Sequence, residues 1–105
     1  MDFQEYTWPL TTPKKVYALL KDKHHIAARR YTGDYTASDI LLDLDYAISL
    51  ANLTQRQKEL LEYLFEMDFT QEETAVKLGV RQHTVSANLQ AALKKIAAVY
   101  SSWFE

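Results

Sequence analysis

The sequence predicts an all-α fold, a small bundle of four to five helices with a helix-turn-helix near the C-terminus. Only two glycines and two prolines occur in 105 residues, too few for a fold rich in turns or irregular coil. Apolar residues make up 48% of the chain, recur at helical spacing and give no credible strand. Finally, residues 69–96 read as a short helix, a glycine-containing turn and a longer helix.

The N-terminal part is expected to comprise an arm and one helix within residues 1–36, ahead of a helical domain in residues 37–105. Residues 1–10 place three aromatic residues among acids, and Pro9 blocks regular structure, so an arm packed on its own domain or on a partner is expected. Thr12 and Pro13 are a typical N-cap and first helical residue. The helix that follows is expected to run through Val16 toward Ile26 and beyond.

Two pairs of residues in this helix carry basic character. His24 and His25 are adjacent, so their rings point in different directions on a helix, and a metal site is not expected. Arg29 and Arg30 either form a solvated basic face or contact phosphate.

Residues 31–36 form the clearest break in the chain, because Gly33-Asp34 is a turn signal. Ser38 is the expected cap of the next helix, whose apolar residues are Ile40, Leu41, Leu44, Ala47, Ile48 and Ala51. Asp39, Asp43 and Asp45 lie on or near it without an accompanying nucleophile or base, which favours a solvated face over a cation site.

Two capping boxes predict the next helix starts. Thr54 with Gln57 begins a helix that buries Leu60, Leu61, Leu64 and Phe65. Thr70 with Glu73 begins the first helix of the helix-turn-helix.

Three residues have separate roles in that unit. Ala75 lets the two helices approach, Gly79 ends the first helix in the left-handed conformation, and Val85 locks the second helix onto the first. The second helix is expected to begin near Gln82.

This combination of residues resembles the fourth conserved region of bacterial sigma factors. The stretches that carry the likeness are Leu53–Gln57, Phe69–Ala75, Leu78–Val80, Thr84–Val85 and Ala92–Ile96. That region reads the promoter −35 element, and small phage and prophage regulators with this domain are similar in length. The resemblance implies a DNA-binding transcription regulator, phage or prophage encoded, that acts at promoters with RNA polymerase.

Helical phase gives the expected DNA contacts. A helix entering the major groove presents its N-terminal residues to base edges, which assigns direct readout to Gln82, His83 and Ser86. Residues placed to hold phosphates or to line the same exposed face are Thr70, Gln71, Lys77, Arg81, Ala87, Gln90 and Lys94.

Three departures from the sigma pattern predict weak binding by one copy. Arg81 replaces the usual Ser or Thr cap, Thr74 replaces a large aliphatic residue, and Ser86, Asn88 and Ala91 stand where basic residues are frequent. The formal net charge of the chain is −2, although residues 70–100 carry four Lys or Arg against two Glu. A second DNA contact is therefore expected from a dimer partner or from RNA polymerase.

The composition also bears on other classes. The absence of cysteine excludes disulfides and thiolate metal sites, and no apolar run approaches the roughly 20 residues of a membrane span. We expect no enzyme activity, metal or cofactor, since no nucleophile–base pair or Gly-rich phosphate loop occurs. Location in the cytoplasm of a bacterial host fits these features.

Two alternatives stay open at this stage. The apolar stripe of the last helix continues through Val99, Tyr100, Trp103 and Phe104, and either packs on the helices before Tyr31 or forms the interface of a homodimer, which is the favoured expectation. A phage DNA-packaging or other DNA-assembly protein, or a protein-interaction module derived from the helix-turn-helix, is the alternative function.

Overall fold

The computed structural model describes residues 11–30 and 35–103, and the helices it contains confirm the all-α prediction. The elements in chain order are α2 (Pro13–Lys21), α3 (Lys23–Arg30), α4 (Tyr35–Leu50), α5 (Gln55–Leu61), the π-helical turn η1 (Glu62–Glu66), α6 (Gln71–Leu78) and α7 (Gln82–Ser102). No strand occurs in the described parts of the chain. The predicted arm in residues 1–10, the Gly33-Asp34 turn and Phe104 lie outside them. The division of the chain at residue 36 stays a prediction.

The helix predicted across residues 13–30 is two helices. Thr12 caps the first as expected, its Oγ1 accepting a hydrogen bond from the Lys15 N–H at 3.3 Å. The break falls at Asp22, and α3 then leaves in a new direction. Its first turn reaches η1, where Lys23 pairs with Glu66 and the His24 Nε2 lies 2.8 Å from the Phe65 carbonyl oxygen. Partners 41 to 43 residues away in the sequence thus accompany the change of direction.

The expectation that Ser38 caps the next helix was wrong, because α4 begins at Tyr35 and Ser38 lies within its first turns. The predicted apolar face is nevertheless correct. Ile40, Leu41, Leu44, Ala47 and Ala51 are buried, and Ile48 packs against them. Asp39, Asp43 and Asp45 are exposed, as predicted.

Helix α5 joins two hydrophobic cores. Leu60 packs with Ala75 and Val85 beneath the helix-turn-helix. Leu61 and Phe65 belong instead to the larger core, which α2, α3, α4 and the C-terminal part of α7 complete. Leu64 contacts both cores from η1. All four residues predicted to be apolar contacts therefore pack, but onto two different sets of partners.

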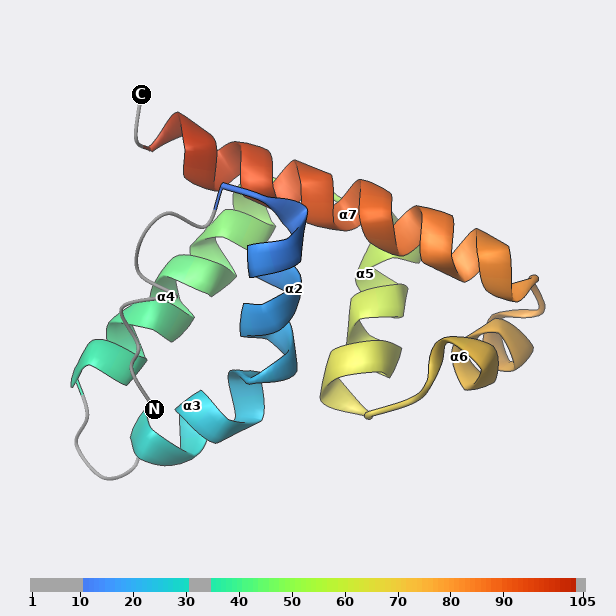
Figure 1. Cartoon of the computed structure of the whole chain (residues 1–105), viewed down its shortest axis with the longest axis horizontal. Helices are drawn as coiled ribbons and strands as arrows, with labels where there is room; N and C mark the ends of the chain where they lie inside the picture. Colours follow the sequence, from blue (N-terminus) through green and yellow to red (C-terminus); the bar gives the residue numbers. More distant parts are fainter. Residues whose placement is uncertain (1–10, 31–34, 104–105) are drawn as a thin grey trace.

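Helix α7 runs along most of the length of the molecule (Figure 1). Its first turns lie over α6, and its C-terminal half lies over α2 and α4. Val85 packs in the smaller core. The larger core contains four other residues of α7: Leu89, Leu93, Ile96 and Tyr100. Within the C-terminal stripe, Tyr100 is buried in the larger core and Val99 packs against it, whereas Trp103 stays 39% exposed, so the dimer alternative stays a prediction. Burial of each such aliphatic side chain is worth about 1.5–3 kcal/mol, so α7 holds the helix-turn-helix and the N-terminal helices in one body.

Candidate nucleic-acid interface

Local features determine where the first helix of the helix-turn-helix, α6, begins and ends. The Thr70 Oγ1 accepts a hydrogen bond from the Glu73 N–H at 3.0 Å, and the Thr70 N–H donates to the Glu73 carboxylate at 2.9 Å. The Thr70 backbone and hydroxyl together hold the pKa of Glu73 below its usual range, so this cap stays charged at neutral pH. At the other end Gly79 adopts the left-handed conformation with φ 67°, which ends α6 as predicted.

The turn leads into α7 without a side-chain cap. Arg81 occupies the N-cap position, and its carbonyl oxygen accepts the N–H groups of Thr84 and Val85, while its side chain makes no capping bond. Val85 is 1% exposed and packs on Ala75, which fixes the rotation of α7 about its axis. That rotation decides which residues α7 presents to solvent.

The helical phase inferred from the sequence is confirmed. Along α7 the exposed residues of the candidate set are Gln82, His83, Ala87, Gln90 and Lys94. Ser86 is half-buried, at the edge of this face, as its angular position predicts. We name the three candidate residues in the first turns of α7, Gln82, His83 and Ser86, the reading edge of α7.

The remaining candidates lie on α6 and in the turn. Lys77 and Arg81 are both exposed. Lys77 is in the last turn of α6, and Arg81 is the N-cap residue of α7. Thr70 and Gln71 are at the opposite end of α6, where Thr70 is already engaged in the capping box. Lys77 and Arg81 therefore lie on either side of the turn that leads into the reading edge, whereas Thr70 and Gln71 lie at the start of α6.

Adjacent lysines of α7 have different surroundings. The Lys94 side chain is exposed on the candidate face. The Lys95 Nζ instead donates to the Gln57 Oε1 at 3.0 Å and lies 3.5 Å from the Asn52 carbonyl oxygen. The same Gln57 oxygen accepts the Thr54 N–H, so Lys95 links the capping box of α5 to α7. Sequence reasoning missed this contact, which joins residues 38 positions apart.

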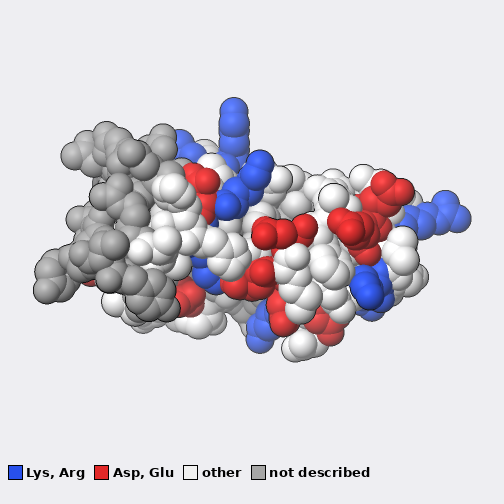
Figure 2. All heavy atoms as spheres, turned by 90° about the horizontal axis from the view of Figure 1, so that it is seen from below, with Lys and Arg blue, Asp and Glu red and all other residues white. Residues whose placement is uncertain are grey.

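One face of the molecule is rich in acidic side chains. Figure 2 views the molecule from the side opposite α7, and acidic side chains gather over the part of it that η1 and α6 form. The exposed acids there are Glu62, Glu66, Asp68, Glu72 and Glu73. Like charge would repel phosphates from this side.

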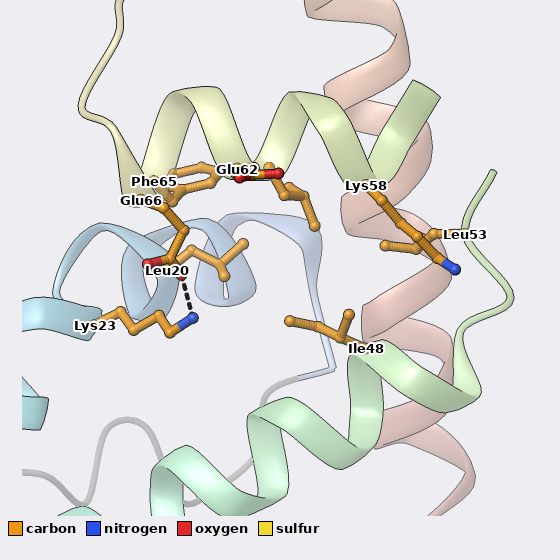
Figure 3. Close-up of a pocket in the computed structure, with 9 residues that line it drawn as sticks. Leu20, Lys23, Ile48, Leu53, Lys58, Glu62, Phe65 and Glu66 are labelled. Carbon is orange, nitrogen blue, oxygen red and sulfur yellow. Dashed lines mark hydrogen bonds and ion pairs between the residues drawn. The ribbon is translucent and has the colours of Figure 1, made fainter. Parts of the chain in front are cut away.

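A pocket lies among the helices α2 to η1, and none of its lining residues belongs to α6 or α7 (Figure 3). It has a volume of about 180 Å³ and lies between the α2–α3 corner, the end of α4 and the α5–η1 segment. Apolar side chains form its floor, and the Lys23–Glu66 ion pair stands at its rim. The lining residues are Leu20, Lys23, Ile48, Leu53, Lys58, Leu61, Glu62, Phe65 and Glu66. This composition offers no nucleophile–base pair.

Residues 11–30 and 35–103 contain no group of three or more His, Cys, Asp or Glu side chains arranged to hold a metal ion. Across the same ranges, no helix has the length and apolar character needed to cross a membrane.

The uncapped start of α7 allows a prediction with two opposite effects. We expect Arg81→Ser to stabilise the fold by about 1 kcal/mol, because a serine hydroxyl would accept one of the free N–H groups. The same change should weaken DNA binding, because it removes a cation beside the reading edge. Thermal unfolding and fluorescence anisotropy on one DNA duplex measure the two effects. Improved stability with unchanged affinity would show that Arg81 does not contact DNA.

Comparison with known families agrees with this geometry. Residues 49–98 match the family model for sigma-70, region 4, a span that holds α5, η1, α6 and most of α7. Comparisons with curated proteins and with solved structures gave no match. The helix-turn-helix expected from the sequence is thus present in both the coordinates and the family match. Residues 49–98 are therefore similar to sigma-70, region 4, which is a DNA-binding helix-turn-helix domain.

Proposed function

We propose that this protein is a sequence-specific DNA-binding transcription regulator that acts at promoters together with RNA polymerase. The observation that carries the proposal is the reading edge at the start of α7, held in place by Val85 within the residues that match sigma-70, region 4. In a helix-turn-helix this is the part of the second helix that enters the major groove. A phage or prophage origin is part of the proposal and rests on the resemblance to small regulators.

The proposed contacts divide by chemistry. Gln82 reads an adenine edge through its amide, and His83 and Ser86 add less discriminating hydrogen bonds. Lys77, Arg81 and Lys94 hold phosphates, which positions α7 without specifying sequence. Ala87 and Gln90 line the same face, and Thr70 and Gln71 approach the backbone only at the far end of α6.

The small number of basic residues has a consequence for assembly. The proposed contact set contains three exposed cations, Lys77, Arg81 and Lys94, which give little non-specific attraction to DNA, and the acidic side of α6 opposes it. A second DNA contact would raise the overall affinity without new chemistry at the first. We therefore propose that the protein works as a homodimer, with RNA polymerase as a further partner on the promoter.

Salt dependence tests the electrostatic part of this function. Each phosphate neutralised contributes about −0.9 to the slope of log affinity against log salt, so three cations predict a slope near −3 per bound subunit. The measurement is fluorescence anisotropy on duplexes selected from a random pool, titrated at several salt concentrations. The triple change Lys77→Gln, Arg81→Gln and Lys94→Gln should flatten the slope.

The selection also tests sequence specificity. Recovery of a defined DNA motif supports a regulator, whereas retention of all sequences alike supports a DNA-assembly protein. Failure to bind any duplex at low salt, with the fold intact, would overturn the proposal in favour of a protein-interaction module.

A further inference from the structure

Helix α4 carries a second apolar stripe on the side that does not face the core. Leu42, Tyr46 and Leu50 are 55%, 57% and 50% exposed, although the opposite side of the same helix is buried. They recur every four residues and so lie within an arc of about 80°. We name these three residues the α4 stripe.

The C-terminal turns of α7 extend the stripe into a continuous surface. The Trp103 ring is 39% exposed and meets the Tyr46 ring edge to face, with 5.9 Å between centroids. At the other end, Leu50 borders a shallow groove with Ala98 and Val99 of α7. Large apolar patches that stay open on a soluble chain usually mark an interface.

Charged side chains lie near both ends of this surface. Asp39 falls in the same arc as the stripe, one turn before Leu42, and is exposed. The other end of α4 lies beside Lys95, whose Nζ is 3.5 Å from the Asn52 carbonyl oxygen. Helix α7 contains no Asp or Glu between Gln82 and Ser102. Asp39 thus lies at one end of the stripe, with the exposed Asp43 and Asp45 beside its middle, and Lys95, whose Nζ also donates to Gln57, lies beyond the other end.

Such a surface is complementary to itself when it is rotated by 180°. In an antiparallel pairing centred on Tyr46, Leu42 of one copy lies beside Leu50 of the other. Asp39 then approaches the end of the partner's α4, where the partner's Lys95 lies. A two-fold interface uses the same patch on both subunits, which is the commonest arrangement in homo-oligomers.

We propose that the α4 stripe and Trp103 are the homodimer interface of this protein, and that its occupant is the same surface of a second copy. The inference names the surface for the homodimer proposed above and requires no DNA contact. The proposed interface differs from the one expected from the sequence, which was the C-terminal stripe of α7. Tyr100 is buried within its own chain, and of the C-terminal aromatic residues that the structure describes only Trp103 is left for a partner.

Sedimentation equilibrium over a range of concentrations tests the proposal on the full chain. We expect a reversible dimer whose dissociation constant rises by roughly tenfold or more in Tyr46→Gln, since an exposed aromatic at an interface centre is a typical hot spot. Leu42→Gln should act in the same direction and keeps the test decisive if the first variant fails to fold. The matched control is Val76→Gln, because Val76 is 78% exposed on α6, away from the stripe.

Charge reversal tests the register. Asp39→Lys should weaken the dimer, and the effect should shrink at high salt. Asp45→Lys makes the same charge change on α4 about 120° from Asp39 and should leave the dimer nearly unchanged. Equal effects of the two substitutions would overturn the antiparallel pairing.

Three outcomes would overturn the interface itself. One is a chain that stays monomeric at every concentration, and another is a dimer insensitive to both stripe substitutions. The third is a full-length monomer that dimerises only after removal of residues 1–10, which would make that segment the occupant. Failure of the interface can be distinguished from failure of the proposed function. A monomer that binds a defined DNA motif would contradict only the interface. A dimer that binds no DNA would contradict only the function.

Discussion

Replacing Tyr100 by alanine is expected to destabilise the fold by about 3 kcal/mol, although the residue lies beyond the helix-turn-helix. Tyr100 is 3% exposed in the core that α7 shares with α2 and α4, and its ring meets Trp103 edge to face at 5.0 Å. Truncation of a buried aromatic ring costs about 3–5 kcal/mol. For a domain of this size the melting temperature should fall by roughly 12–24 °C, measured by circular dichroism.

The conservative change should act in the opposite direction. The Tyr100 hydroxyl is buried, and the described residues offer it no hydrogen-bond partner. An unsatisfied buried group costs about 1–3 kcal/mol, so Tyr100→Phe is expected to be neutral or to stabilise by about 1 kcal/mol. Destabilisation by Tyr100→Phe would show that the hydroxyl is bonded in solution.

Alkaline titration gives a second readout of this residue. Burial raises the pKa of Tyr100 above its ordinary range, and the nearby charges of Asp43 and Asp45 add to the shift. The unfolded chain therefore loses this proton first, and folding stability should fall as pH rises above about 10. The stability difference between Tyr100→Phe and the unchanged protein should widen over the same range.

Features of the fold that depend on local bonds could be predicted from the sequence. Both capping boxes involve residues three positions apart, and Gly79 needs no partner to adopt a positive φ. The exposed face of α7 follows from helical periodicity once Val85 is assigned to the core. These features fixed the helix-turn-helix and the reading edge without any knowledge of tertiary contacts.

Features that depend on distant partners could not be predicted. The break at Asp22 accompanies contacts of Lys23 and His24 with η1. The residues next to Asp22 in the sequence contain no helix-breaking signal that predicts it. The π-helical turn is closed by the Met67 N–H bond to the Glu62 carbonyl at 3.0 Å, and a left-handed Asp68 follows it. Lys94 and Lys95 look equivalent in sequence, yet only a partner on α5 distinguishes them.

The apolar stripe of α4 was missed for a different reason. Residues 40–51 are so rich in apolar side chains that one buried face could be chosen without noticing a second. Leu42, Tyr46 and Leu50 become conspicuous only when the buried residues of α4 are known. Packing thus moved the expected dimer surface from the α7 tail to α4.

The largest expected effect on DNA recognition is at the reading edge. We expect Gln82→Ala to reduce the preference for the selected motif over a scrambled duplex by roughly tenfold or more, because a bidentate amide–adenine pair is worth about 1–3 kcal/mol. His83→Ala should reduce it less, since a single imidazole contact discriminates less well. Both side chains are exposed, so circular dichroism and the melting temperature should stay nearly unchanged.

A matched substitution separates readout from a general effect of removing a surface amide. Gln55 is also exposed and is the first residue of α5, as Gln82 is the first of α7. Gln55→Ala is expected to leave both affinity and preference unchanged. The affinity ratio of each variant for motif and scrambled DNA is the quantity to compare at fixed salt. Equal ratios for Gln55→Ala and Gln82→Ala would place base recognition elsewhere than the start of α7, whereas a ratio lowered only in Gln82→Ala assigns an amide contact with a base to this helix.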